Sequence, residues 1–300
     1  MPAFQKNIVN KIQSQSIKFL TSIALCLEDS IRDDALAEAE VSLTEILREL
    51  KKLSESGITL PLIFIRVRSP EHLQSIHNKL FDFTSILTGY ILPKFDLSNA
   101  ENYAAIVYEI NRDHTDPLYI MPILETEMIA DVMTRNKSLV KIKRVLDIIK
   151  DYILNVRVGV NDLSNLYGLR RDINHTVYDL GIIRDILINI LNIFAKDYVV
   201  AGSVYNFFGS DNSGLKKELE LDKLNGFVGK TAIHPAQLPI IYESLKVNRI
   251  DYEDALKILN WQSDSHGVAK GNNRMNELKC HSKWAQRIKI LSEVYGIKDD

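Results

Sequence analysis

Short apolar runs rich in β-branched residues alternate along the chain with longer stretches whose apolar positions recur at helical spacing. This alternation is typical of βα units and predicts a parallel sheet. The helical stretches include residues 34–53, 126–151 and 180–196, of which the last is apolar nearly all round. The runs that we expect to form buried strands are residues 23–27 (IALCL), 62–67 (LIFIRV), 90–93 (YILP), 119–124 (YIMPIL), 156–160 (VRVGV), 198–201 (YVVA) and 228–233 (VGKTAI).

These seven runs are one fewer than a closed (β/α)8 barrel needs. Residues 4–20 have helical spacing, so residues 1–3 would be the end of a first strand that is otherwise missing. Two interpretations stay open: the natural start lies upstream, or the barrel closes with a stub. We therefore predict an α/β fold, a (β/α)8 TIM barrel with an apparently truncated first strand, over residues 1–250.

A C-terminal helical extension, residues 251–300, is expected to follow the barrel. Its two helical segments, residues 252–261 and 276–295, are joined by the polar stretch QSDSHGVAKGNNR. A polar, glycine-containing connection is typical of a lid or an oligomerisation arm. A plain helical hairpin packed on the barrel is an equally good interpretation.

Composition excludes several classes of protein. The formal net charge is −2 over 300 residues, with Lys and Arg spread along the chain, which argues against nucleic acid or an anionic membrane as the main partner. Two cysteines are too few for a disulfide framework or a thiolate zinc site. The N-terminal region does not have the pattern of a signal peptide, and no apolar stretch approaches the roughly 18 residues of a membrane span. We expect a cytoplasmic protein.

Ionisable residues follow six of the seven predicted strands. In a TIM barrel the carboxyl ends of the strands form one rim, where catalytic groups lie. So many charges directly after apolar runs are hard to explain as solvated loop ends, and buried charges need partners or a metal. In strand order, the residues are Glu28 and Asp29, Arg66 and Arg68, Lys94, Glu125, Asp162, and His234.

Glu125 and Asp162 follow neighbouring strands, so their carboxylates can converge. Two hard oxygen ligands without His or Cys nearby suit Mg²⁺, with Mn²⁺ as the other candidate. Arg66 can grip a substrate carboxylate with its planar guanidinium. Glu28 and Asp29 could orient Arg66 or a metal-bound water, although either could instead cap the following helix.

Six segments, in the same order along the chain, resemble the citrate lyase β subunit-like branch of the HpcH/HpaI aldolases, which are Mg²⁺-dependent carbon–carbon lyases. The pair PILET and GVNDL is the most specific. The resemblance implies that Glu125 and Asp162 bind Mg²⁺, that Arg66 binds the substrate carboxylate, and that Glu28 is the first acid of the family's LED motif. The segments are IALCLEDSI (23–31), IFIRVRSP (63–70), ILPKFD (91–96), PILET (122–126), VRVGVNDLSNLYGLRR (156–171) and GKTAIHPAQ (229–237).

The chain departs from that family at two places. Arg68 stands where the family has a small polar residue; strand alternation puts Arg68 on the side of Arg66, which would suit a more anionic, even phosphorylated, substrate. The acid that reaches a neighbouring subunit's site in CoA-dependent relatives has its nearest counterpart here in Glu277. The C-terminal arm is more similar to a divergent subgroup associated with bacterial stress and tellurite-resistance gene clusters.

The resemblance implies retro-aldol or retro-Claisen cleavage of a 2-oxo or hydroxy carboxylic acid through a metal-stabilised enolate. Arg66, Glu28 and Lys94 are then the catalytic candidates, with Arg68, Asp29, Glu277 and His234 as further substrate-binding candidates. His234 could instead mainly shape the turn before Pro235. Two alternatives remain, a CoA-thioester lyase or hydrolase and a barrel that binds a metabolite or partner without turnover. The family further implies a homo-oligomer, either a trimer or a hexamer.

Overall fold

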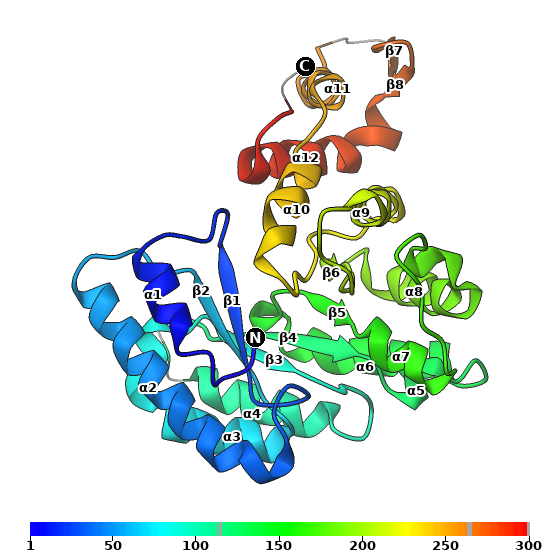
Figure 1. Ribbon diagram of the computed structural model, residues 1–300. Helices are drawn as coiled ribbons and strands as arrows, with labels where there is room; N and C mark the ends of the chain where they lie inside the picture. Colours follow the sequence, from blue (N-terminus) through cyan, green and yellow to red (C-terminus); the bar gives the residue numbers. More distant parts are fainter. Residues whose placement is uncertain (113, 115, 263–265, 299–300) are drawn as a thin grey trace. The chain divides into compact units, whose positions relative to one another are not determined.

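The chain forms two compact units, Met1–Leu238 and Pro239–Asp300. The computed structural model describes residues 1–112, 114, 116–262 and 266–298. Figure 1 gives the element labels used below.

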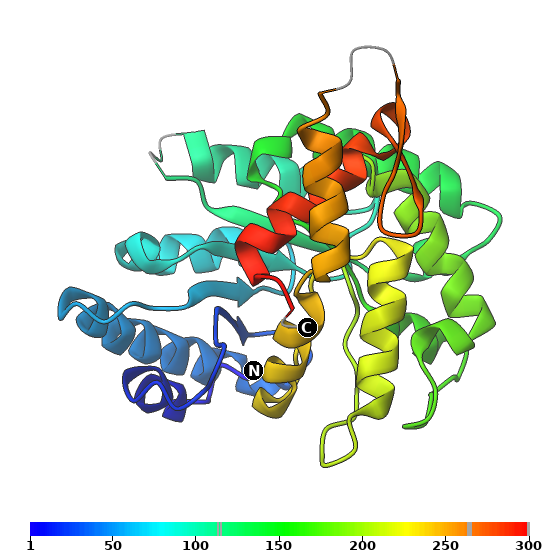
Figure 2. The same cartoon turned by 90° about the horizontal axis from the view of Figure 1, so that it is seen from above.

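The larger unit is built on a six-stranded parallel sheet in which the strands pair in chain order; Figure 1 labels these strands, and Figure 2 shows the same ribbon from above. This confirms six of the seven predicted strands and the α/β class. An isolated parallel bridge extends each edge, Pro2 to Cys26 on one side and Gly202 to Lys230 on the other. The strands are β1 (Ser22–Cys26), β2 (Leu62–Arg66), β3 (Gly89–Leu92), β4 (Tyr119–Leu124), β5 (Val156–Val158) and β6 (Val200–Ala201).

The predicted strand over residues 228–233 is wrong: within the described chain, only Lys230 makes a bridge there. Its neighbour Gly229 has a φ of 75°, a left-handed conformation that interrupts an extended run. Strand pairing in the described residues therefore ends at Pro2 and Lys230, and the sheet is an open half-barrel. Residues 1–3, which we expected to be the end of a first strand, contribute the parallel bridge from Pro2 to Cys26.

Helices follow the strands through the larger unit. Two predicted helices are shorter than their patterns suggested. The helix expected over 4–20 ends at Gln13, because Gln15 and Phe19 have positive φ angles. The stretch 126–151 is divided where the Asp131 carboxylate accepts hydrogen bonds from the Met133 N–H and the Thr134 hydroxyl. The helices are α1 (Asn7–Gln13), α2 (Leu36–Glu55), α3 (Pro70–Lys79), α4 (Ala100–Arg112), α5 (Glu127–Ala130), α6 (Arg135–Ile148), α7 (Val160–Leu166), α8 (Gly181–Phe194) and α9 (Ser213–Asn225), with 3-10 turns η1 (Asp33–Ala35), η2 (Phe81–Ile86), η3 (Lys150–Tyr152), η4 (Val177–Asp179) and η5 (Pro235–Gln237).

The two faces of the sheet differ in character. Alternate strand residues such as Ile65 and Leu124 join the main hydrophobic core together with helix residues such as Leu43. The other face carries a small apolar cluster made by Phe64, Ile91, Met121 and Ile123, with Ala24 against it. Because side chains alternate along a strand, Arg66 and Glu125 share this second face with Phe64 and Ile123.

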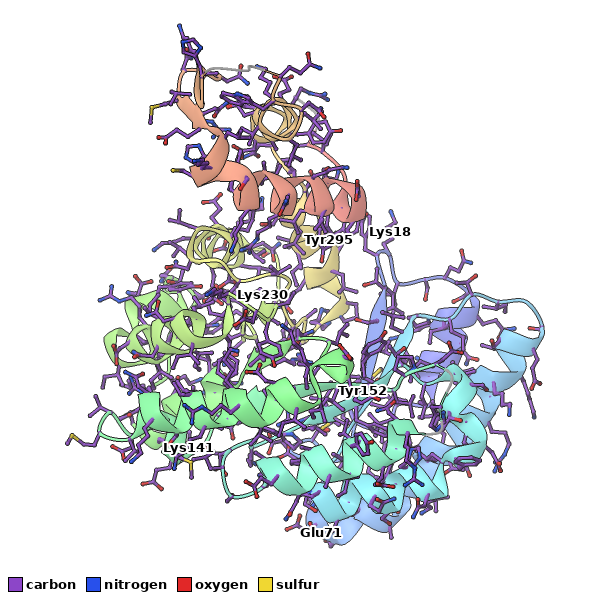
Figure 3. All side chains as sticks on the ribbon, turned by 180° about the vertical axis from the view of Figure 1, so that it is seen from behind. Lys18, Glu71, Lys141, Tyr152, Lys230 and Tyr295 are labelled. Atoms are coloured by element: carbon purple, nitrogen blue, oxygen red, sulfur yellow. The ribbon has the colours of Figure 1, made fainter. Side chains whose placement is uncertain are left out.

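A buried ionic network holds α9 to the Lys230 edge. The Lys230 ammonium, whose side chain is 0% exposed, lies 2.9 Å from Glu218 and 2.7 Å from Asp222, both on α9. Arg171 lies 3.3 Å from Glu218, and the Tyr178 hydroxyl donates a 2.7 Å hydrogen bond to Asp222. Figure 3 marks Lys230. Each of these charges has a partner, and the network adds to the backbone hydrogen bonds at this edge, from Val228 N–H to the Val200 carbonyl and from Gly202 N–H to the Gly229 carbonyl.

The smaller unit contains α10 (Leu238–Leu245), which starts at the boundary between the units, α11 (Arg249–Leu259) and α12 (Leu278–Tyr295). A two-stranded antiparallel hairpin, β7 (Val268–Lys270) and β8 (Met275–Glu277), lies where the sequence predicted only a polar connection. Residues 263–265 of that connection lie outside the described residues. The predicted helices at 252–261 and 276–295 are confirmed as α11 and α12, apart from end shifts.

Two interactions organise the smaller unit. Ala255, Ile258 and Ala285 pack α11 against α12. The buried Asp254 accepts a 2.6 Å hydrogen bond from Arg274 Nε, which ties the hairpin to α11. In the part of the chain that the structure describes, no helix has both the length and the apolar character needed to span a membrane.

Candidate active site

The carboxyl ends of β1 to β5 lie along one edge of the sheet, since the strands are parallel and pair in chain order. Five predicted residues follow these ends, and the structure connects them through direct contacts or through their charges. They are Glu28, Arg66, Lys94, Glu125 and Asp162.

Glu125 is the most enclosed carboxylate of the group, at 4% exposed. Its Oε1 accepts a 2.9 Å hydrogen bond from the backbone N–H of Lys94. A Cβ atom placed on Gly159 would lie only 1.8 Å from Oε2, so glycine is required there for the carboxylate to take this position. Leu124 and Val158 are partners in the sheet, which explains why Glu125 meets Gly159.

Burial is the largest influence on the Glu125 carboxyl and raises its pKa to about 7. The Arg66 charge lowers this pKa, while the negative charges of Asp162 and Glu28 raise it. A second cation at this position would therefore stabilise the ionised form of Glu125.

Asp162 lies in the first turn of α7 and is half-buried. Its influence on the Glu125 pKa places the two carboxylates within electrostatic range of each other. No group of three or more His, Cys, Asp or Glu side chains in the described chain could hold a metal ion. A protein site here would thus offer only two carboxylates.

Such a donor set fits Mg²⁺, which commonly takes one or two carboxylates and completes its octahedron with water and substrate oxygens. The surroundings of the two Glu125 carboxylate oxygens agree with a role as a metal ligand. Within the described residues no hydrogen bond reaches Oε2, whereas Oε1 is held by Lys94. Oε2 lies close to Gly159, at a position that only a residue without a Cβ permits.

Arg66 links the acidic residues. Its Nη2 lies 2.6 Å from Glu28, 3.0 Å from Asp29 and 3.4 Å from Glu125. The side chain is 20% exposed, and its buried Nε has no hydrogen-bond partner among the described residues. The guanidinium is therefore held by carboxylates through Nη2, and its Nε is a buried donor without a partner in the described part of the chain.

Lys94 contributes two different groups to the site. Its φ of 50° is rare for a residue with a side chain, and the backbone N–H points to Glu125 in this conformation. Its ammonium donates hydrogen bonds to Glu28 at 2.7 Å and to Asp29 at 3.1 Å. Lys94 thus fixes Glu125 and neutralises the acidic pair that follows β1.

The other predicted residues lie apart from this group. Arg68 donates hydrogen bonds to the carbonyl oxygens of Leu27 and Ile31, because β2 ends at Arg66 and strand alternation does not extend further. His234 is exposed, stacks on Phe208 at 4.4 Å, and caps η5.

Glu277 belongs to the smaller unit, where its backbone N–H donates to His281. The substrate-binding roles of Arg68, His234 and Glu277 remain predictions.

Arg157 is a charged residue on this face that the sequence argument missed. It lies inside β5, whereas the predicted site residues are charges that follow a strand. Burial lowers its pKa to about 10, with a further lowering from Arg66, and the Glu125 charge opposes both. The signal in the sequence was an arginine at an inward position of the apolar run VRVGV.

The charges of the site nearly balance. Four acidic groups carry −4 and three basic groups carry +3 when all are ionised, which gives −1, and a divalent cation would change this to +1. With the cation bound, the net charge of +1 would favour an anionic ligand. The groups counted are Glu28, Asp29, Glu125, Asp162, Arg66, Lys94 and Arg157.

These features define a half-barrel α/β protein with a carboxylate–arginine site at the strand ends. A family model described as "C-C_Bond_Lyase of the TIM-Barrel fold" matches residues 1–297, and the chain belongs to this family. This confirms the prediction that the chain belongs to a family of carbon–carbon bond lyases. The more specific assignment to a stress-associated subgroup stays a prediction. No curated protein matches the sequence.

Solved structures share the fold at low identity. A citrate lyase from Burkholderia xenovorans LB400 has a TM-score of 0.74 at 15% identity, over 99% of this chain and 91% of that chain. The protein CitE from Mycobacterium tuberculosis, crystallised with magnesium, acetoacetate and coenzyme A, has a TM-score of 0.64 at 16% identity, over 98% and 96% of the two chains.

A citrate lyase β subunit from Mycobacterium tuberculosis, complexed with oxaloacetate and magnesium, has a TM-score of 0.51 at 17% identity, over 81% of this chain and 93% of that chain. At such identities the likeness concerns the fold alone.

Proposed function

We propose that the protein is an Mg²⁺-dependent lyase that cleaves or forms a carbon–carbon bond in a 2-oxo or hydroxy carboxylic acid. Membership of the carbon–carbon lyase family supports the reaction class. Two structural relatives crystallised with magnesium and a small carboxylic acid support the choice of ligands.

The observation that carries the proposal is the placement of Glu125 beside Gly159, with the charge of Asp162 in range. A buried carboxylate near a second carboxylate is unfavourable without a compensating cation. Arg66 supplies part of that compensation from one side of Glu125. A divalent cation between Glu125 and Asp162 would supply the rest.

Each side chain then has a role. Bound Mg²⁺ would act as a Lewis acid that stabilises the enolate formed as the carbon–carbon bond breaks. Arg66 would bind the substrate carboxylate by exchanging part of its contact with Asp29, which is the more exposed of its acidic partners. Burial raises the pKa of Glu28, while the charge of Arg66 and the hydrogen bond from Lys94 lower it, and in this proposal Glu28 would accept the proton.

Calorimetry with Mg²⁺ and a panel of 2-oxo acids tests this function, followed by detection of released pyruvate, acetate or glyoxylate. Asp162→Ala should abolish metal-dependent turnover while the thermal unfolding profile is unchanged. Full turnover by this variant, together with no effect of EDTA on the wild-type protein, would refute the mechanism.

A CoA-thioester substrate is the second candidate, favoured by the coenzyme A in the CitE relative's crystals. In this version the C-terminal unit of a neighbouring subunit would close the site in a homo-oligomer, with Glu277 as the contributed acid. Exposed apolar residues of that unit, including Val268 and Met275, are available for such a contact. Retention of a CoA ester through purification, and a trimeric or hexameric mass by light scattering, would favour this version.

A further inference from the structure

Arg157 occupies an inward position in the middle of β5. Its register partners are Ile123 on β4 and Ala201 on β6. Ile123 belongs to the apolar cluster on the face that also carries Arg66 and Glu125. Arg157 therefore enters the same space as the proposed site, and its charge acts on both Arg66 and Glu125.

The surroundings of Arg157 lack a carboxylate in direct contact. Its Nη2 donates a hydrogen bond to the Thr231 hydroxyl, and among the described residues no Asp or Glu oxygen lies within 4.0 Å of it. Other enclosed arginines of the larger unit do have such a partner: Arg66 contacts Glu28, and Arg171 contacts Glu218.

An arginine that is half-buried in an apolar face and lacks an ionic partner is costly to the folded state. It has five N–H donors in a fixed plane, and a single hydroxyl oxygen uses few of them. The remaining donors suit a planar carboxylate, which accepts two parallel hydrogen bonds from a guanidinium. Arg66 cannot supply the negative charge that Arg157 lacks, because Arg66 is itself a cation.

We infer that Arg157 binds a second carboxylate of the substrate, so that the protein selects small dicarboxylic 2-oxo or 2-hydroxy acids over monocarboxylic ones. This inference rests on the proposed function, in which Arg66 and the metal hold the first carboxylate. Arg157 is then a specificity-determining residue, and Thr231 orients its guanidinium.

The test compares two ligands that differ only in the second carboxylate. Malate and 2-hydroxybutyrate share the hydroxy-acid end, but malate has a carboxylate where 2-hydroxybutyrate has a methyl group. Calorimetry in the presence of Mg²⁺ should show that the wild-type protein binds malate at least about tenfold more tightly, the value of one charge-assisted hydrogen-bonded contact.

Arg157→Met should bring the malate preference close to one and leave the affinity for 2-hydroxybutyrate unchanged. Arg157→Lys, which keeps the charge, should retain part of the preference, and this guards against an effect of folding alone. Arg170→Met is the matched control, because Arg170 is an exposed arginine of the same unit. That variant should behave as wild type.

Three results would overturn the inference. The first is a wild-type protein without preference for malate, and the second is an Arg157→Met variant that keeps the preference. The third is that binding of 3-phosphoglycerate depends on Arg157 while binding of malate does not, which would show that Arg157 binds a phosphate instead of a carboxylate. A failure of the proposed function gives a different result from a failure of this inference. If the proposed function is wrong, malate binding would be unaffected by EDTA and by Asp162→Ala, while Arg157→Met would still remove the preference for malate.

Discussion

Gly159→Ala tests how closely the site depends on the position of Glu125. The added Cβ would lie 1.8 Å from Glu125 Oε2, and Cβ contacts under 3.0 Å essentially never occur, so the oxygen must move by at least 3.0 − 1.8 = 1.2 Å. Mg²⁺ requires oxygen ligands at about 2.0–2.1 Å in near-octahedral geometry. A displacement of this size removes Glu125 as a ligand, and we expect Mg²⁺ affinity to fall by about 10- to 100-fold.

The assay is calorimetric titration of Mg²⁺ into the variant and the wild-type protein, with thermal unfolding measured in EDTA. Overpacking should also reduce stability by about 1–3 kcal/mol, since the Cβ would lie 2.6 Å from the Cβ of Glu125. Gly181→Ala is the control, because no atom lies within 4 Å of its added Cβ. A Gly159→Ala protein that binds Mg²⁺ as tightly as wild type would refute the role of Glu125 as a ligand.

Two further substitutions test the supports around the site. Lys230→Met leaves Glu218 and Asp222 buried without their ammonium partner, so urea unfolding should show that the free energy of unfolding falls by about 3–5 kcal/mol. The control, Lys141→Met on the exposed surface, should change it little. A fall below about 1 kcal/mol for Lys230→Met would show that the network does not stabilise the fold. Arg68→Ala removes hydrogen bonds to the loop after β1, so the free energy of unfolding should fall by about 1–3 kcal/mol while ligand affinity changes little. A large loss of ligand affinity at unchanged stability would instead place Arg68 at the substrate.

The strands could be predicted because apolar, β-branched runs are a local signal. Residues 119–124 were expected as a strand and form β4 over the same residues. The run at 228–233 (VGKTAI) also begins and ends with β-branched apolar residues, but Gly229 turns the backbone and Lys230 is held by charges from α9. Neither influence is visible in the pattern of the run itself, since one is a backbone angle and the other is a contact with a distant helix.

The candidate site was predictable to the extent that topology alone determines it. Charges that follow adjacent parallel strands meet at one edge, and Glu28, Arg66 and Lys94 are in direct contact as this rule requires. Arg68 also lies just beyond its strand, but its guanidinium donates to the carbonyl oxygens of Leu27 and Ile31, and the rule does not say which way a side chain past the strand end will turn. Arg157 was missed for the opposite reason: it lies within a strand, where register and neighbouring residues decide its surroundings.

The central claim is that Glu125 and Asp162 together hold one divalent cation. Titration with Mn²⁺, followed by the electron paramagnetic resonance signal of the free ion, measures this directly and needs no substrate. We predict one site per chain in the wild-type protein, displaced by Mg²⁺ and weakened at least about tenfold in both Glu125→Gln and Asp162→Ala. Wild-type affinity in either variant, or no binding by the wild-type protein, would contradict the account.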